Sequence, residues 1–153
     1  MTTRTSVEEL VYRSCLALDA RDYESFLDLC HFSFRYVAEA YSPEIRRNMI
    51  WLDQDKSGME TLFRNLPRHY SDTAPLSRHA TVYVVQIDEA RRQAEAVSAL
   101  QVFRTALDGG ETALFAVGKL YDTAIFEGGA ARLIKRTLRL DTRSLGIGTH
   151  IPI

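Results

Sequence analysis

The sequence predicts an α+β fold in which a curved antiparallel sheet wraps around N-terminal helices to form a cone. Three observations lead to this prediction. Apolar residues recur at helical spacing up to Leu66, side chains alternate in character from Arg78 onward, and two acidic-Gly-Gly turns follow in the C-terminal half. With 153 residues and 46% apolar side chains, the chain is long enough for a single domain, 1–153, with its own core.

Two helices are expected to form a hairpin at the N-terminus. Ser6 and Glu9 have the spacing of a capping box, in which a hydroxyl and a carboxylate accept hydrogen bonds from exposed backbone amides. Behind this cap, residues 7–18 place Val, Leu and Cys side chains on one stripe, which indicates a buried face. After a short break, Asp22 is the predicted cap of a second helix, which carries Phe26.

Two short strands and a third helix are predicted next. Residues 34–41 mix aromatic and small side chains as strands do, and residues 48–52 predict a second short strand. Ser57 and Glu60 repeat the capping-box spacing ahead of a helix that we expect to stop at Pro67. The three helices are then available to close the concave face of a sheet.

Long antiparallel strands are predicted for the C-terminal half. The alternation in residues 78–87 and the long segment 92–107 indicate two strands. The glycine pairs in 108–110 and 127–129 supply the positive φ angles of tight hairpins, so the strands should run as a meander. Strands of this length twist and curl, and Gly118 is a candidate position for a bulge or bend.

The charge balance argues against two classes of partner. Nineteen basic and twenty acidic residues give a net charge of −1, so the sequence predicts no binding to nucleic acid or to an anionic membrane. No run approaches the roughly 20 apolar residues that span a bilayer, and the first residues lack the apolar segment of a secretory signal. We therefore expect a cytoplasmic protein in which Cys15 and Cys30 are free, buried thiols.

The sequence predicts no metal and no cofactor in this chain. Its histidines and cysteines show none of the C-x-x-C, H-x-x-x-H or H-E-x-x-H spacings that hold metals, and only Cys30 and His31 are adjacent. Neither a G-x-G-x-x-G nor a phosphate-binding G-x-x-x-x-G-K-[ST] motif is present. The histidines considered are His31, His69, His79 and His150.

Acid–base chemistry in a pocket is a hypothesis that the residues leave open. His79 and Tyr83 share a parity on one predicted strand, so both could face the interior of a cone. Asp53, Tyr36 and His31 lie on segments that could approach the same cavity. Histidines and tyrosines on strands also occur at core boundaries without any catalytic role, and this reading stands beside the first.

A basic run and an apolar tail suggest subunit contacts. The basic residues of 132–143 point to both faces of a strand, which does not fit a phosphate backbone but fits either a solvated face or an ion-paired interface. The tail, 145–153, has no formally charged side chain, so we expect it to dock on its own domain or on a neighbour. The interface candidates are Arg132, Arg136, Arg139, Arg143, Ile151 and Ile153.

The chain resembles the small, or beta, subunit of the Rieske non-haem iron ring-hydroxylating dioxygenases, whose domain has the nuclear transport factor 2-like, SnoaL-like cone. Four segments in the same order carry the resemblance. They are LALDARDYESFLDL (Leu16–Leu29), Phe34-Arg35-Tyr36, Ser77-Arg78-His79 ahead of TVYVV, and LIKRTLRLD (Leu133–Asp141).

The resemblance implies a non-catalytic role. In that family the large (alpha) subunit holds the Rieske [2Fe–2S] cluster and the mononuclear iron, and the small subunits form a trimeric base of an α3β3 assembly that degrades aromatic compounds. Two alternatives stay open. One is a stand-alone lyase, isomerase or cyclase of the same fold, with His79 and Asp53 or Tyr36 as proton carriers, and the other is a small-ligand-binding module.

Overall fold

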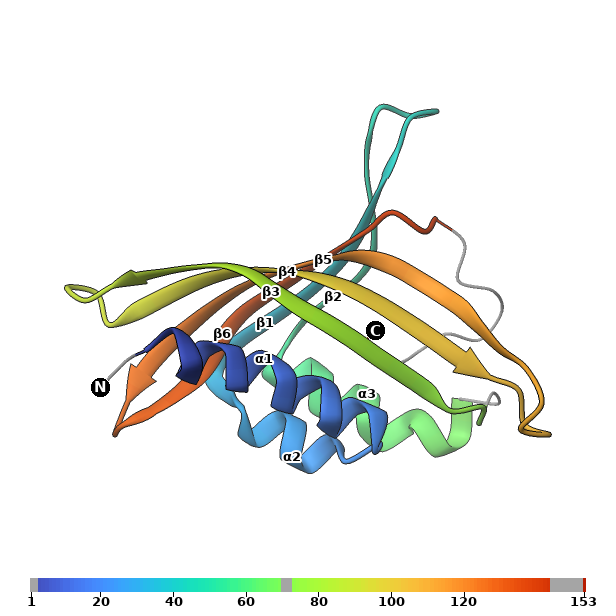
Figure 1. Cartoon of the computed structure of the whole chain (residues 1–153), viewed down its shortest axis with the longest axis horizontal. Coiled ribbons are helices and arrows are strands. Elements are labelled where there is room, and N and C mark those ends of the chain that lie inside the picture. Colours follow the sequence, from blue (N-terminus) through green and yellow to red (C-terminus); the bar gives the residue numbers. More distant parts are fainter. Residues whose placement is uncertain (1–2, 70–72, 144–152) are drawn as a thin grey trace.

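Three helices cover one face of a curved, unclosed six-stranded sheet in the computed structural model, which describes residues 3–69, 73–143 and 153 (Figure 1). The predicted α+β class, a curved sheet around N-terminal helices, is confirmed. The helices are α1 (Arg4–Asp19), α2 (Tyr23–Asp28) and α3 (Lys56–His69). The strands are β1 (Cys30–Ser42), β2 (Arg47–Asp55), β3 (Leu76–Asp88), β4 (Gln93–Thr105), β5 (Thr112–Glu127) and β6 (Ala130–Leu140).

The sheet is mixed rather than wholly antiparallel. Its strand order is β2-β1-β6-β5-β4-β3, and every neighbouring pair is antiparallel except β1 and β6, which are parallel. Hairpins join β3 through β6 in a meander, as predicted, but no turn joins β1 to β6. Local sequence therefore does not dictate the direction of that pair. The strands β2 and β3 form the two edges.

Helix α1 begins one turn earlier than predicted. The Thr3 hydroxyl accepts a hydrogen bond from the Ser6 amide, and the Ser6 hydroxyl accepts one from the Thr3 amide, so these two residues form the capping box. The predicted box of Ser6 and Glu9 is wrong. The earlier start brings Arg4 into the helix.

Helices α2 and α3 are capped by aspartates. Asp22 caps α2 as predicted. At α3, Oδ1 of Asp55 accepts a hydrogen bond of 2.8 Å from the amide of Gly58, so the predicted cap at Ser57 is wrong and the helix begins at Lys56. Pro67 lies inside α3 and does not end it.

An aromatic cluster packs α2 and α3 against β1. Phe26, Phe34 and Tyr36 are completely buried, with the rings of Phe26 and Phe34 in an edge-on arrangement at 6.2 Å. Tyr23 of α2 stacks on Phe63 of α3 at 4.3 Å. Burying each such side chain stabilises the fold by about 1.5–3 kcal/mol, so this cluster fixes the two short helices on the sheet.

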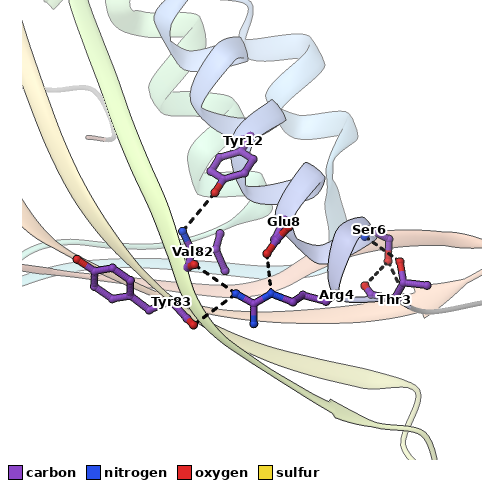
Figure 2. A network of polar contacts seen from close by, with 7 residues as sticks. All are labelled: Thr3, Arg4, Ser6, Glu8, Tyr12, Val82 and Tyr83. Atoms are coloured by element: carbon purple, nitrogen blue, oxygen red, sulfur yellow. Dashed lines mark hydrogen bonds and ion pairs between the residues drawn. The ribbon is translucent and has the colours of Figure 1, made fainter.

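Side chains of α1 form hydrogen bonds with backbone groups of the edge strand β3 (Figure 2). The hydroxyl of Tyr12 accepts a hydrogen bond of 3.3 Å from the Val82 amide. The guanidinium of Arg4, held by Glu8 at 2.7 Å, donates to the carbonyl oxygens of Val82 and Tyr83, each at 3.4 Å. An exposed strand edge can pair with another chain, and these contacts block part of this edge.

The two predicted glycine turns are confirmed. Gly109 has φ of 75°, and Gly128 and Gly129 have φ of 58° and 79°, in the left-handed region where a side chain would be strained. They join β4 to β5 and β5 to β6.

Gly118 has a different role from the predicted bulge. It pairs in continuous register with Leu100 on β4 and with Leu140 on β6, and no register shift occurs there. A Cβ at this position would collide with the carbonyl oxygen of Arg139. The glycine therefore permits a close approach of the β5 and β6 backbones.

Candidate functional site

Tyr36, one of the predicted proton carriers, lies deep in the core. Its side chain is completely buried, and its hydroxyl donates a hydrogen bond of 3.1 Å to the main-chain oxygen of Ile153. Burial raises the pKa of Tyr36 to about 12. The phenol therefore stays protonated at neutral pH, and its hydrogen bond holds Ile153 against the core.

His31 is buried at the start of β1, beside the end of β5. Its Nδ1 lies 2.8 Å from the Ser33 hydroxyl and also accepts from the Ser33 amide, so the neutral ring carries its proton on Nε2. Nε2 is 3.2 Å from Oε2 of the exposed Glu127, although the two are not aligned as a hydrogen bond. The contacts with Ser33 lie within β1, and the one with Glu127 links the beginning of β1 to the end of β5.

His79 and Tyr83 face away from the helices. Both are exposed, whereas Arg78 and Val82 of the same strand are buried toward the core. The parity that the sequence suggested for the interior is thus the outer one over this part of β3. On that face the His79 ring lies edge-on to Phe103 at 5.0 Å, and its Nε2 lies 3.0 Å from the Ser77 hydroxyl.

Asp53 lies on β2, at the opposite edge of the sheet from β3. Its Oδ1 forms an exposed ion pair of 2.8 Å with Arg35. The structure therefore does not bring Asp53 to His79. Within the described ranges, no hydrogen bond or ion pair joins any two of the five candidate proton carriers, His31, Tyr36, Asp53, His79 and Tyr83.

A buried ion pair occupies the core beneath β5 and β6. The guanidinium of Arg136 donates to both oxygens of Asp122, at 2.7 and 3.0 Å, and the two side chains are 1% and 3% exposed. Burial opposes the charge on Arg136, but the carboxylate of Asp122 holds the pKa of the guanidinium above its ordinary value. Burial also raises the pKa of the nearby Cys15 thiol.

Arg136 was an interface candidate from sequence, and its position in the core rules out a contact with another subunit. A bulge explains the difference. Thr123 pairs with Lys135 while Ala124 pairs with Leu133, so one extra residue on β6 reverses the parity between Arg132 and Arg136.

Two aspartates that pair with buried arginines were not among the residues singled out from the sequence. Asp122 lies on the same face of β5 as the buried Leu120 and Ala124. An acidic residue at a position where the neighbouring residues of that face are apolar is a signal that could have revealed the buried pair. Asp19, at the end of α1, accepts hydrogen bonds from the Arg78 amide at 3.0 Å and from its guanidinium at 2.9 Å. The Asp19–Arg78 pair joins α1 to β3, and the Asp122–Arg136 pair joins β5 to β6.

The other three basic candidates lie at the surface. Arg132 donates to the carbonyl oxygen of Asp28 at 2.7 Å, and Arg139 pairs with Glu39 at 3.2 Å. Arg143 is bonded to Glu44 at 2.6 Å, and this bond, with further hydrogen bonds, lowers the pKa of the Glu44 carboxyl to about 2. All three retain exposed surface for a partner.

The tail residue Ile153 is 4% exposed and packs in the chain's own core, while Ile151 lies outside the described residues. Of the two alternatives predicted for the tail, Ile153 therefore follows the first, since it docks on its own domain.

Three surface depressions lie at turns of the sheet. Their volumes are about 480, 370 and 340 Å³, and they lie at the β3–β4 turn, between α1 and the β5–β6 turn, and at the β4–β5 turn. None of these three is lined by any of the five candidate proton carriers. Arg132 lines the second of them.

In residues 3–69, 73–143 and 153, no three His, Cys, Asp or Glu side chains gather in a group that could hold a metal ion. Over the same ranges, no helix has the length and apolar character needed to cross a membrane.

Residues 13–146 match the family model described as ring hydroxylating beta subunit. The chain belongs to this family. The resemblance stated from the sequence is thereby confirmed. The match covers all six strands and α2 and α3, so the fold described above is the fold of the family domain.

Two curated relatives and one solved structure extend the comparison. The chain is 40% identical to the methanesulfonate monooxygenase hydroxylase subunit beta of Methylosulfonomonas methylovora, over 97% of this chain and 86% of the relative. It is 33% identical to the 2-aminobenzenesulfonate 2,3-dioxygenase subunit beta of an Alcaligenes species, over 97% of each chain. A Novosphingobium aromaticivorans protein assigned as an aromatic-ring-hydroxylating dioxygenase beta subunit superimposes with a TM-score of 0.83 at 22% identity, covering 98% of this chain and 96% of the other.

Proposed function

We propose that this chain is the non-catalytic small (beta) subunit of a Rieske-type oxygenase and that it supports and orients a large (alpha) subunit. The observation that carries the proposal is the family match over residues 13–146, joined to 40% identity with an oxygenase beta subunit along almost the whole chain. The chain is proposed to act as one domain, 1–153, in the cytoplasm.

The arrangement of titratable side chains favours this role over the stand-alone enzyme. A lyase, isomerase or cyclase of this fold would need a proton carrier pair in a shared pocket. Asp53 and His79 lie on opposite edge strands, and the buried Arg136 and Asp122 are bonded to each other. An arginine in such a pair stabilises structure and does not carry protons.

The proposal places the redox chemistry in the partner. The large subunit would hold the Rieske [2Fe–2S] cluster and the mononuclear iron, and three small subunits would associate as a trimeric base in an α3β3 complex. Arg132, Arg139 and Arg143 are the surface cations that we propose for contacts between subunits, because each is exposed while already oriented by a partner in its own chain.

The substrate class of the complex is proposed from the relatives. One is named for methanesulfonate and the other for 2-aminobenzenesulfonate, so both names contain an organosulfonate, one aliphatic and one aromatic. We propose that the complex containing this chain oxygenates an organosulfonate. The predicted role in the degradation of aromatic compounds is proposed for aromatic organosulfonates.

Co-expression with the large subunit tests the proposal. We expect the two chains to copurify, iron and acid-labile sulfide to be found in the complex, and oxygen-dependent turnover of an organosulfonate to need both chains. Turnover of an organic compound by the isolated chain, or failure of the large subunit to copurify with it, would contradict the proposal.

A further inference from the structure

The edge strand β3 is bonded along its backbone by side chains of α1. At one end, Oδ1 of Asp19 accepts a hydrogen bond of 3.0 Å from the amide of Arg78. Four residues further along β3, the hydroxyl of Tyr12 accepts a hydrogen bond of 3.3 Å from the amide of Val82 (Figure 2). Residues two or four apart on a strand direct their amides to the same side. Both amides therefore lie on the outer edge of β3, away from β4.

Carbonyl oxygens of the same edge are bonded as well. The guanidinium of Arg4 donates to those of Val82 and Tyr83, each at 3.4 Å (Figure 2). Arg4, Tyr12 and Asp19 follow one another at about two helical turns along α1, so they lie on one side of the helix. We call these three side chains the edge guard. The edge guard holds backbone groups that would otherwise be open to another strand.

The covered strand has a composition that favours pairing with other strands. Residues 80–87 have the sequence ATVYVVQI, which contains no charged residue, no proline and no glycine. Most of its side chains are β-branched or aromatic, the types that strands prefer. Short segments with these properties associate with one another when they lie on an exposed edge. An uncovered β3 would therefore be a site for association between copies.

A bulge adds to the protection at the centre of this segment. The register with β4 shifts between Val82 and Val84, so Tyr83 is the extra residue on β3. Bulges interrupt the regular row of backbone groups that a further strand would need. The bulge lies at a carbonyl oxygen that the edge guard holds, so two different devices protect the same point of the edge.

We propose that the edge guard keeps β3 from pairing with β3 of a second copy of this chain, and that loss of its contacts turns residues 80–87 into an association site. The occupant is a second copy because the segment complements itself. Identical uncharged segments pair without placing like charges opposite each other. The intact protein prevents this contact, so it is separate from the self-association in the proposed function, and the inference does not depend on that function.

The double variant Arg4→Met with Tyr12→Phe tests the edge guard. It removes three hydrogen bonds to β3 and leaves Asp19, whose carboxylate also pairs with the buried Arg78. We expect association about tenfold or more tighter than in the wild type, measured by sedimentation velocity over a protein concentration series, because bonds that compete with strand pairing are lost.

Hydrogen exchange at the Val82 amide locates the contact. In the double variant this amide should exchange faster than in the wild type at low protein concentration, because Tyr12 no longer accepts its hydrogen bond. At high concentration its protection should return, because a strand of the second copy replaces the lost acceptor. An exchange rate that does not depend on protein concentration overturns the inference.

Arg13→Met with Tyr41→Phe is the matched control. Arg13 lies on α1, is exposed and pairs with Glu9, and Tyr41 is an exposed tyrosine on β1. Neither side chain belongs to the edge guard, so this variant should associate as the wild type does. Tighter association of the control variant overturns the assignment to the edge guard.

Val84→Lys, added to the double variant, separates edge pairing from a general loss of stability. Val84 is exposed, and a lysine on an edge strand opposes pairing because it places like charges together when two copies meet. The triple variant should return to the association of the wild type, within about threefold. A double variant that sediments like the wild type, or association that Val84→Lys does not reverse, overturns the inference.

Discussion

Arg136 and Asp122 face each other on β6 and β5, joined by two hydrogen bonds and shielded almost completely from solvent. Replacing Arg136 with Met leaves a carboxylate buried without its counter-charge, so we expect a loss of about 3–5 kcal/mol in the free energy of unfolding. Urea denaturation of the isolated chain measures the loss. A change below about 1 kcal/mol would contradict the burial of the pair.

The double variant Arg136→Met with Asp122→Leu distinguishes the contribution of the ion pair to stability from that of side-chain packing. It removes both charges, so we expect it to be more stable than either single variant. Additive losses in this cycle would mean that the two side chains do not interact.

Gly118 allows β5 and β6 to approach each other closely. Gly118→Ala places a methyl group against the carbonyl oxygen of Arg139, and we expect a loss of about 1–3 kcal/mol because backbone must shift. Gly110→Ala is the control, since a Cβ there meets only the exposed carboxylate of Asp108, at 3.2 Å. Equal stability of the two variants in thermal unfolding would refute the close approach.

Tyr36 should make the fold less stable as the pH rises into the alkaline range. Burial raises its pKa from 10.0 to about 12, so the stabilisation from the neutral phenol is complete below pH 10 and is lost as the pH rises toward 12. We expect the unfolding free energy of Tyr36→Phe to fall less steeply in this window than that of the wild type. The Cys30 thiol, whose pKa burial raises to about 12, is present in both proteins and cancels in the difference.

Tyr12 protects one backbone amide of the β3 edge. In Tyr12→Phe the Val82 amide loses its acceptor, and we expect its hydrogen exchange to accelerate about fivefold, which corresponds to a hydrogen bond of about 1 kcal/mol. Tyr41→Phe, at an exposed tyrosine on β1, is the control. Equal Val82 exchange rates in the two variants would show that the hydroxyl does not hold this edge.

Features specified by local chemistry were predictable. The turns at Gly109 and Gly128 require positive φ angles, and the cap at Asp22 requires a short side chain with a hydrogen-bond acceptor ahead of a helix. Each of these features can be predicted from the residues next to it in the sequence. The cap of α1 was displaced by one turn because Thr3 and Ser6 offer an equivalent box and Arg4 gains contacts with β3.

Features that depend on distant pairing were not predictable. The parallel alignment of β1 and β6 has no turn to specify it, and the bulges near Tyr83 and Ala124 reverse the parity on which the placement of His79 and Arg136 depended. A single bulge was enough to exchange a surface arginine for a core one. The candidate site could therefore be described only from the three-dimensional arrangement.

The parallel pairing of β1 with β6 has a consequence for synthesis on the ribosome. The backbone of Leu133 bonds to that of Leu29 at 2.8 Å, and the β1–β6 register runs on to Leu140. Until the last strand has emerged from the exit tunnel, β1 can pair only with β2, and its inner neighbour is missing. Completion of the sheet must therefore follow translation of the residues up to Leu140, and pairing over so long a sequence separation favours slow folding.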